Sequence, residues 1–146
     1  MDNVPIAVRR LQFAAGHRVY GHESKCANLH GHNYVVFIHA RQKQGGLDSI
    51  GRVIDFGVLK ERYGFWIDSF WDHGTLLYTK DPLRSLFVSH ELLLGQKRFD
   101  CPFNPTAEEM AKHLLNIGPE LFRDTDVEVF KIVLWETENC RAEVSL

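Results

Sequence analysis

Residues 13–33 read FAAGHRVYGHESKCANLHGHN, and the rest of the chain is organised around this stretch. His17, His30 and His32 form a histidine pattern in it, and Cys26 stands four residues before His30. In a strand, residues i and i+2 point to the same face, about 7 Å apart at the Cα atoms, so His30 and His32 can close on one ion. Three imidazoles without a fourth protein ligand are typical of a catalytic zinc ion, which keeps one position open. We therefore interpret the stretch as a metal site.

Other interpretations of these residues stay open at this point. Histidines can gather by chance in a polar loop, and Cys26 can be a fourth ligand that closes a structural zinc site. Cys26 can also be a small buried hydrophobe, or a thiolate base favoured by a nearby dication. Cys101 and Cys140 have no such neighbours in sequence, and we expect them to be structural.

The composition indicates an ordinary single domain, which we expect to cover residues 1–146. The hydrophobic residues make up 45% of the chain and the charged residues 25%, with a net charge of −2. The sequence has no basic stripe, no run of 18 apolar residues and no apolar signal segment, so neither nucleic acid nor a membrane is an expected partner. The odd number of cysteines suits reduced thiols, and the cytoplasm is the expected compartment.

The pattern of apolar residues predicts an α+β domain with strands grouped at both ends of the chain, adjacent ones pairing antiparallel. Three segments have helix start signals: Asp55, Asp81-Pro82, and the capping box Thr106-Ala107-Glu108-Glu109. The predicted strands are 4–13, 34–40, 127–136 and 141–144, with short extended pieces at 52–54 and 75–78. The predicted helices are 56–70, 81 to a stop at Gly95, and 107–117, and the predicted loops include 16–28 and 97–105.

Two further places carry candidate functional groups. Asp72 precedes His73, and a carboxylate beside an imidazole can fix its tautomer for acid/base work, although a solvated helix end also explains the pair. Glu136 continues the face of Phe130, Ile132 and Leu134, so its carboxylate should end an apolar surface. Such a group needs a partner, for example a ligand with paired N–H donors; an exposed strand end is the alternative.

Six pieces of the chain resemble, in the right order, the motifs of the 6-pyruvoyltetrahydropterin synthase / 6-carboxytetrahydropterin synthase family. They cover nearly the whole chain. The spacer of three residues between Cys26 and His30 resembles the bacterial 6-carboxytetrahydropterin synthase branch, which makes the 7-deazaguanine precursor of queuosine. The pieces are Phe13-x-Ala15-x-His17, Cys26-x-x-Leu29-His30-Gly31-His32-Asn33-Tyr34, Val53-Ile54-Asp55-Phe56, Asp72-His73, Asn104-Pro105-Thr106-Ala107-Glu108 and Glu136-Thr137.

The resemblance implies a zinc-dependent carbon–carbon lyase. Its substrate would be 7,8-dihydroneopterin triphosphate, and the carboxy branch would release 6-carboxy-5,6,7,8-tetrahydropterin, triphosphate and acetaldehyde. His17, His30 and His32 would hold Zn²⁺, whose open position takes the substrate hydroxyls.

The resemblance also implies roles for the remaining candidates. Cys26 would remove the carbon-bound proton, and His73, oriented by Asp72, would return a proton elsewhere. Glu136 would grip the 2-amino group and ring N–H of the pterin, and it is also placed in the proton relay by some descriptions of the family. The residues that would help to hold the base are Thr106, Ala107 and Glu108.

The fold implied by the resemblance is the tunnelling fold: an antiparallel β-sheet with helices on one face, trimers that close a barrel, and a homohexamer of two stacked trimers. A lone copy would have open sheet edges, which is consistent with assembly. Two departures, Gly74-Thr75-Leu76-Leu77 after His73 and the extra length of 78–101, leave the product open. The rivals are a 6-pyruvoyl-type or other side-chain-cleaving pterin lyase, and a non-catalytic structural zinc protein.

Overall fold

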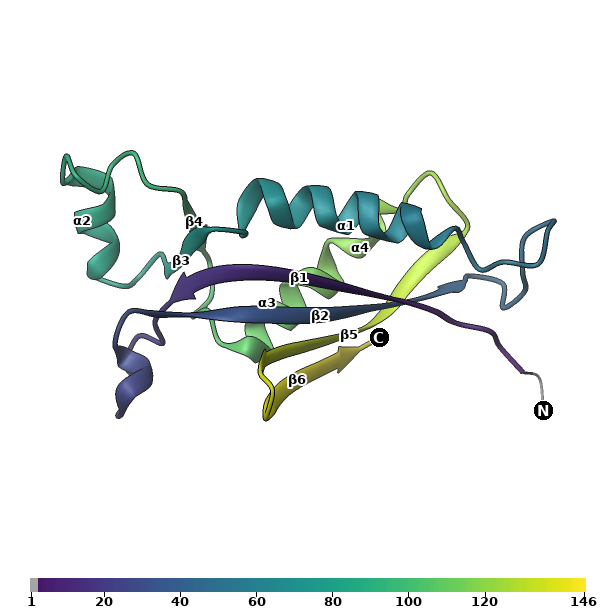
Figure 1. The fold of residues 1–146 in the computed structure, drawn as a ribbon, viewed down its shortest axis with the longest axis horizontal. Helices are drawn as coiled ribbons and strands as arrows, with labels where there is room; N and C mark the ends of the chain where they lie inside the picture. The colour runs from purple at the N-terminus through teal and green to yellow at the C-terminus, as the bar shows by residue number, and fades with distance from the viewer. Residues whose placement is uncertain (1–2) are drawn as a thin grey trace.

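The computed structural model describes residues 3–146 and consists of one twisted six-stranded sheet with helices on one face (Figure 1). Residues 1–2 of the predicted domain lie outside the described range. The strand order is β4-β3-β1-β2-β5-β6. The four long strands pair antiparallel, as expected, and two short strands extend the sheet at one end. The strands are β1 (Ala7–His17), β2 (His30–Gln42), β3 (Gly74–Tyr78), β4 (Arg98–Cys101), β5 (Val127–Thr137) and β6 (Cys140–Ser145).

The expectation of a wholly antiparallel sheet is wrong for β3 and β4. β3 runs parallel to the last residues of β1, and β4 runs parallel to β3. Parallel neighbours need a crossover of a dozen or more residues, and the extra length of segment 78–101 supplies that crossover. The predicted loop at 97–105 therefore contains a strand, which is too short to show an alternating pattern in sequence. The extended piece predicted at 52–54 is not a strand.

Helix α1 (Phe56–Phe70) starts where the sequence predicts, and the Asp55 carboxylate accepts a hydrogen bond from the Gly57 amide. Helix α2 (Leu83–Ser89) ends before the predicted stop at Gly95, because His90 leaves the helical conformation and the chain turns. The other helices are α3 (Ala107–Asn116), α4 (Gly118–Leu121) and the 3-10 helix η1 (Lys25–Ala27). Gly118-Pro119, predicted as a helix end, also begins α4, since proline is well tolerated in a first turn.

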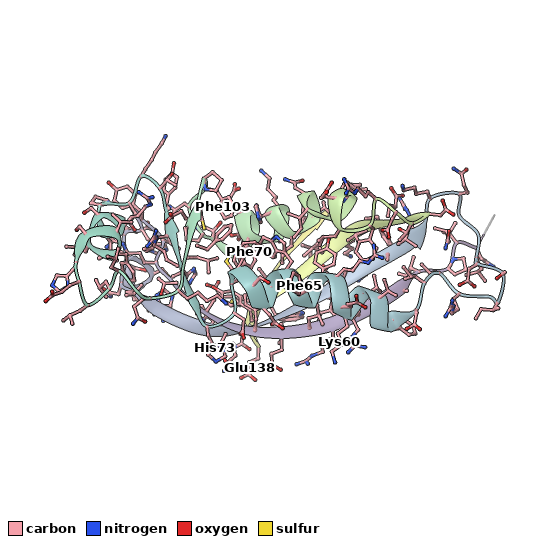
Figure 2. The ribbon with its side chains drawn as sticks, turned by 90° about the horizontal axis from the view of Figure 1, so that it is seen from above. Lys60, Phe65, Phe70, His73, Phe103 and Glu138 are labelled. Atoms are coloured by element: carbon pink, nitrogen blue, oxygen red, sulfur yellow. The ribbon has the colours of Figure 1, made fainter. Side chains whose placement is uncertain are left out.

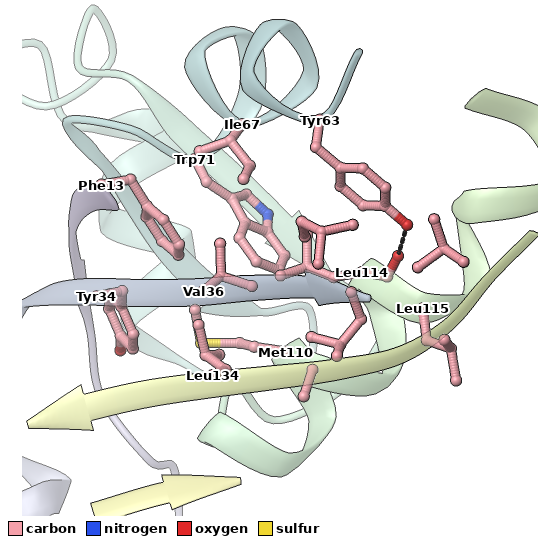
Figure 3. Packing of buried hydrophobic residues seen from close by; sticks show 14 of the residues in the cluster. Phe13, Tyr34, Val36, Tyr63, Ile67, Trp71, Met110, Leu114, Leu115 and Leu134 are labelled. Atoms are coloured by element: carbon pink, nitrogen blue, oxygen red, sulfur yellow. Dashed lines mark hydrogen bonds between the residues drawn. The ribbon is translucent and has the colours of Figure 1, made fainter. Parts of the chain in front are cut away.

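The core lies between the sheet and helices α1 and α3, and it supports the end of β1 that bears the histidine pattern (Figure 3). Phe13 stacks on Tyr34 at 5.0 Å between ring centroids, and both belong to the first two strands. Trp71 and Met110 pack beside them and are fully buried. Tyr63 donates a hydrogen bond of 2.8 Å to the Leu114 carbonyl, which links α1 to α3. These contacts fix the strands from which the site side chains project.

A β-bulge changes the predicted face of β5. The β2–β5 register shifts between His39 and Ala40, which leaves Phe130 as the extra residue. Phe130 lies against His39 and Arg41, on the face opposite the helices, so its predicted place beside Ile132 is wrong. Beyond the bulge the alternation resumes, and the strand carries Glu136 towards the histidines.

Candidate metal centre

The register of β1 and β2 brings the three histidines together. His17 pairs directly with His30, so β1 extends four residues beyond the predicted end at Phe13. The ring centroids lie 4.7 Å apart for His17 and His30, and 4.9 Å apart for His30 and His32. Gly31 lies between the two β2 histidines, where a Cβ atom would stand only 3.1 Å from the Ala15 carbonyl oxygen. Glycine therefore permits the close approach of the two strands at the site.

Glu136 from β5 is the fourth member of this group. The ligand atoms of His17, His30, His32 and Glu136 all lie within 4.8 Å of one another, and we call these four residues the histidine cluster. Glu136 Oε1 is 3.2 Å from His17 Nε2 and 3.0 Å from His32 Nε2. The sequence places Glu136 at the end of an apolar surface but gives no sign of this contact, because the contact depends on long-range pairing of β5 with β2.

Backbone carbonyls select the tautomers of two of the histidines. His17 Nδ1 lies 2.7 Å from the Pro105 carbonyl oxygen, and His30 Nδ1 lies 2.6 Å from that of Asn28. Because a carbonyl oxygen only accepts, each Nδ1 carries the proton and donates it. The Nε2 lone pair of each neutral ring is then available to a metal ion, as in metal sites whose second ring nitrogen bonds to the protein.

The histidine cluster fits a divalent cation. With Nδ1 of His17 protonated, a neutral His17 turns its Nε2 lone pair towards the Glu136 carboxylate, and two acceptors face each other. His32 Nε2 is buried and has no hydrogen-bond partner, although the Glu136 carboxylate is near. A bound cation would satisfy both nitrogens and offset the negative charge of the nearby carboxylate.

Hydrogen bonding and burial shift the pKa values of Glu136 and His32. When His17 also carries a proton on Nε2, its hydrogen bond to Glu136 holds the pKa of that carboxyl below its usual range, against the effect of burial. Burial lowers the pKa of His32, which favours the neutral, metal-binding form of the ring. An ionised Glu136 and a neutral His32 are the forms of these two residues that suit a bound cation.

Cys26 lies on the wall of the cavity above the histidine cluster. This cavity has a volume of about 640 Å³, and its walls include His30, His32 and Glu136. Cys26 is not among the four grouped ligand residues, so the structure gives no support to a closed site with Cys26 as fourth ligand. Cys140, expected to be structural, is exposed and lines the same cavity. The sequence gives no sign that Cys140 lines the cavity, because its position there depends on the turn between β5 and β6.

Asp72 and His73 form the predicted pair but lie outside this cavity. His73 Nδ1 is 2.8 Å from Asp72 Oδ2, and Asp72 Oδ1 accepts a hydrogen bond of 2.9 Å from the Ala14 amide. His73 has a φ of 60°, and 81% of its side chain is exposed. Figure 2 shows it at the margin of the molecule, pointing outwards. It lines a second hollow of about 380 Å³, and His32 of the histidine cluster lies on the wall of both hollows.

The electrostatics around Asp72 keep its carboxylate charged. Burial would raise the pKa of Asp72, but the Ala14 amide, His73 and the positive charge of Lys97 together lower it. Lys97 also donates to the Asp72 carbonyl oxygen, which fixes the turn between α1 and β3. The ion pair of Asp72 and His73 is therefore held in place by the surrounding residues, but neither residue lines the cavity that contains Cys26.

The segment before α3 has a structural explanation for each predicted contact residue. Thr106 caps the helix by accepting from the Glu109 amide, Ala107 is buried, and Glu108 is exposed. None of the three lines the cavity at the histidine cluster. The neighbouring Pro105 reaches the site through its carbonyl, which holds His17.

The fold and site together define an α+β protein in which three histidines and one glutamate, placed so that they could hold a metal ion, lie at one end of a mixed sheet. The chain belongs to the 6-pyruvoyl tetrahydropterin synthase family, which matches residues 6–146. It is 43% identical over 137 residues to a 6-carboxy-5,6,7,8-tetrahydropterin synthase from Rickettsia typhi, covering 93% of this chain and 96% of that one. The corresponding protein from Haemophilus influenzae is 32% identical over 132 residues, covering 88% and 90%.

Solved structures show the same fold. An uncharacterized protein from Wolinella succinogenes superposes with a TM-score of 0.86 at 23% identity, covering 99% of both chains. The 6-pyruvoyl tetrahydropterin synthase of Caenorhabditis elegans superposes with a TM-score of 0.64 at 23% identity, covering 100% of this chain and 99% of that one. None of the helices in the described part of the chain has the length and apolar character needed to cross a bilayer.

Proposed function

We propose that this chain is a zinc-dependent carbon–carbon lyase that makes 6-carboxy-5,6,7,8-tetrahydropterin for 7-deazaguanine biosynthesis, the route to the queuosine precursor. It would convert 7,8-dihydroneopterin triphosphate and water to this product, triphosphate and acetaldehyde. The observation that carries the proposal is the histidine cluster at the floor of a cavity with two free cysteines, Cys26 and Cys140, on its wall. The 43% identity to a synthase of this name supports the choice of reaction. The three free thiols agree with a reducing compartment, and we propose the cytoplasm.

The metal-binding residues in this proposal are His17, His30 and His32. When bound, Zn²⁺ would acidify the side-chain hydroxyls and the adjacent C–H of the substrate. Cys26, on the wall of the cavity, would take the carbon-bound proton as thiolate. Glu136 would accept hydrogen bonds from the 2-amino group and ring N–H of the pterin, which fixes the substrate against the histidine cluster. The segment at Thr106, Ala107 and Glu108 would help to hold the pterin.

The position of Asp72 and His73 supports a site shared between copies of the chain, and we propose that the assembly is a homohexamer of two stacked trimers. The pair lies outside the cavity of its own chain, so it would serve the cavity of a neighbouring copy. Sheet edges are available for assembly. Within residues 3–146, only Ala15–His17 of β1 pair with β3, which leaves the rest of that edge of β1 unpaired, and β6 is the last strand of the sheet. The proposed site is therefore complete only where subunits meet.

Mixing two inactive variants tests this arrangement. Cys26→Ala and His73→Ala hexamers should each be inactive, but dissociating and reassembling them together should restore turnover. If each site takes Cys26 and His73 from different copies, about a quarter of the sites in an equal mixture are intact. The measurement is the rate of product formation before and after subunit exchange. No recovery in verified mixed hexamers would show that one chain supplies both residues.

Glu136→Gln distinguishes a substrate anchor from a metal ligand. The substitution keeps the shape of the side chain and removes its charge. If Glu136 anchors the substrate, the KM of Glu136→Gln should be about tenfold or more above the wild-type value, because a charged hydrogen-bond acceptor is lost. Zinc content, measured by atomic absorption after dialysis, should stay at the wild-type level. Loss of zinc would instead make Glu136 a ligand.

Incubation of the zinc-loaded protein with 7,8-dihydroneopterin triphosphate tests the proposed reaction. Mass spectrometry should identify 6-carboxy-5,6,7,8-tetrahydropterin as the pterin product. A 6-pyruvoyl product would favour the rival lyase. The likeness to the Caenorhabditis elegans enzyme does not favour that rival, since 23% identity establishes the fold alone.

A further inference from the structure

Arg18, the residue that follows the first histidine of the cluster, makes an ion pair that the proposed reaction does not use. Its guanidinium donates two hydrogen bonds to the carboxylate of Asp81, one from Nε over 2.6 Å and one from an Nη atom. Asp81 is only 3% exposed and stands at the base of segment 78–101, between β3 and α2. It also accepts from the Leu83 amide, so both oxygens have partners. A planar, two-point pair of this kind fixes direction as well as distance.

Arg18 lies between His17 and Val19, and each of these two neighbours contacts or belongs to the proposed site. His17 precedes it and belongs to the histidine cluster. Val19 follows it, and the Val19 amide donates a hydrogen bond of 2.8 Å to the carbonyl oxygen of Cys26. A displacement of Arg18 would therefore move a metal-binding ring on one side and the backbone of Cys26 on the other.

The opposite side of the same segment is held separately. The Asn104 side chain accepts from the Tyr20 amide and donates to the Tyr20 carbonyl, at 3.0 and 2.8 Å. The Pro105 carbonyl accepts from His17 Nδ1. Residues 17–20 thus lie between two anchors, one before α3 and one in segment 78–101. Without the Asp81 anchor, the side-chain hydrogen bonds that join residues 18–20 to the rest of the described chain would come from Asn104 alone.

We propose that Arg18 and Asp81 are positioning residues that hold His17 and Cys26 in place, and that this is a second role of segment 78–101 beyond carrying the crossover to β4. The inference rests on the proposed metal site. Neither residue touches the metal or the substrate in this account; each acts through the backbone of residues 17–19. Displacements of about 1 Å are enough to reduce turnover by about a hundredfold in enzymes, and changes in residues that support a ligand reduce metal affinity by about 10- to 100-fold.

Metal binding by three variants tests the proposal in the full-length protein. Asp81→Asn removes the charge, and Arg18→Lys keeps the charge but loses the two-point contact. Asp100→Asn is the matched control, because it breaks the contacts of Asp100 with Arg84 and Arg98 in the same segment without touching residues 17–20. Zinc affinity is measured by competition with a chromophoric chelator, and ligand geometry by the visible spectrum of the Co²⁺-substituted protein.

We expect Asp81→Asn and Arg18→Lys to weaken zinc binding about tenfold, to shift the Co²⁺ spectrum and to lower kcat more than KM changes. Asp100→Asn should leave all three at wild-type values. Folded Asp81→Asn and Arg18→Lys proteins with wild-type zinc affinity and Co²⁺ spectra would overturn the proposal, whatever their thermal stability. If Asp81→Asn does not fold, Arg18→Lys decides alone. A wild-type protein that gives no pterin product would refute the proposed reaction but not this positioning role.

Discussion

Replacing Cys26 with alanine is expected to abolish turnover while zinc stays bound. Cys26 lines the cavity above the histidine cluster but is not one of the four residues of the cluster. Removing a general base costs about 10²- to 10⁴-fold in rate, and the thiol has no neighbour of the same chemistry in the cluster. The measurements are the single-turnover rate with 7,8-dihydroneopterin triphosphate and the zinc content of the same sample.

Cys101→Ala is the matched control for this substitution. Cys101 is fully buried at the end of β4, and burial raises the pKa of its thiol to about 12, so it cannot be a base near neutral pH. The variant should lose some stability and keep its rate per folded molecule. Loss of zinc and unfolding of Cys26→Ala would instead support the structural zinc site, in which Cys26 is a ligand.

Replacing His32 with alanine is expected to remove both zinc and turnover. His32 contributes a buried Nε2 with no hydrogen-bond partner, and two imidazoles alone leave the ion with too few protein ligands. Zinc content after dialysis against a weak chelator, together with the turnover rate, checks the result.

His22→Ala provides the control for the His32 variant. His22 belongs to the same stretch, but its Nδ1 accepts from the Ser24 amide and it is outside the histidine cluster. This variant should keep its zinc and its rate. A His32→Ala protein with full zinc content and activity would contradict the assignment of the histidine cluster as the metal site.

Local patterns account for the parts of the site that the sequence could predict. The i, i+2 spacing of His30 and His32 on a strand places both rings on one face, and Asp72 beside His73 can form its hydrogen bond within two residues. The caps at Asp55 and Thr106 likewise depend on neighbours in sequence, and the structure confirms both.

Long-range pairing explains what the sequence could not predict. The contact of Glu136 with the histidines depends on the register of β5 against β2, and a bulge at Phe130 alters that register. The four residues of β4 pair only because segment 78–101 crosses over, which no local pattern indicates.

Trapping of acetaldehyde is the most direct test of the central claim that this chain is a carbon–carbon lyase. The zinc-loaded protein is incubated with 7,8-dihydroneopterin triphosphate and a carbonyl-trapping hydrazine, and triphosphate is quantified in the same reaction. We expect acetaldehyde and triphosphate in equal amounts, formed together with 6-carboxy-5,6,7,8-tetrahydropterin. Release of triphosphate without acetaldehyde would contradict the claim, because the carbon–carbon bond of the substrate side chain that the lyase should cleave would then be unbroken.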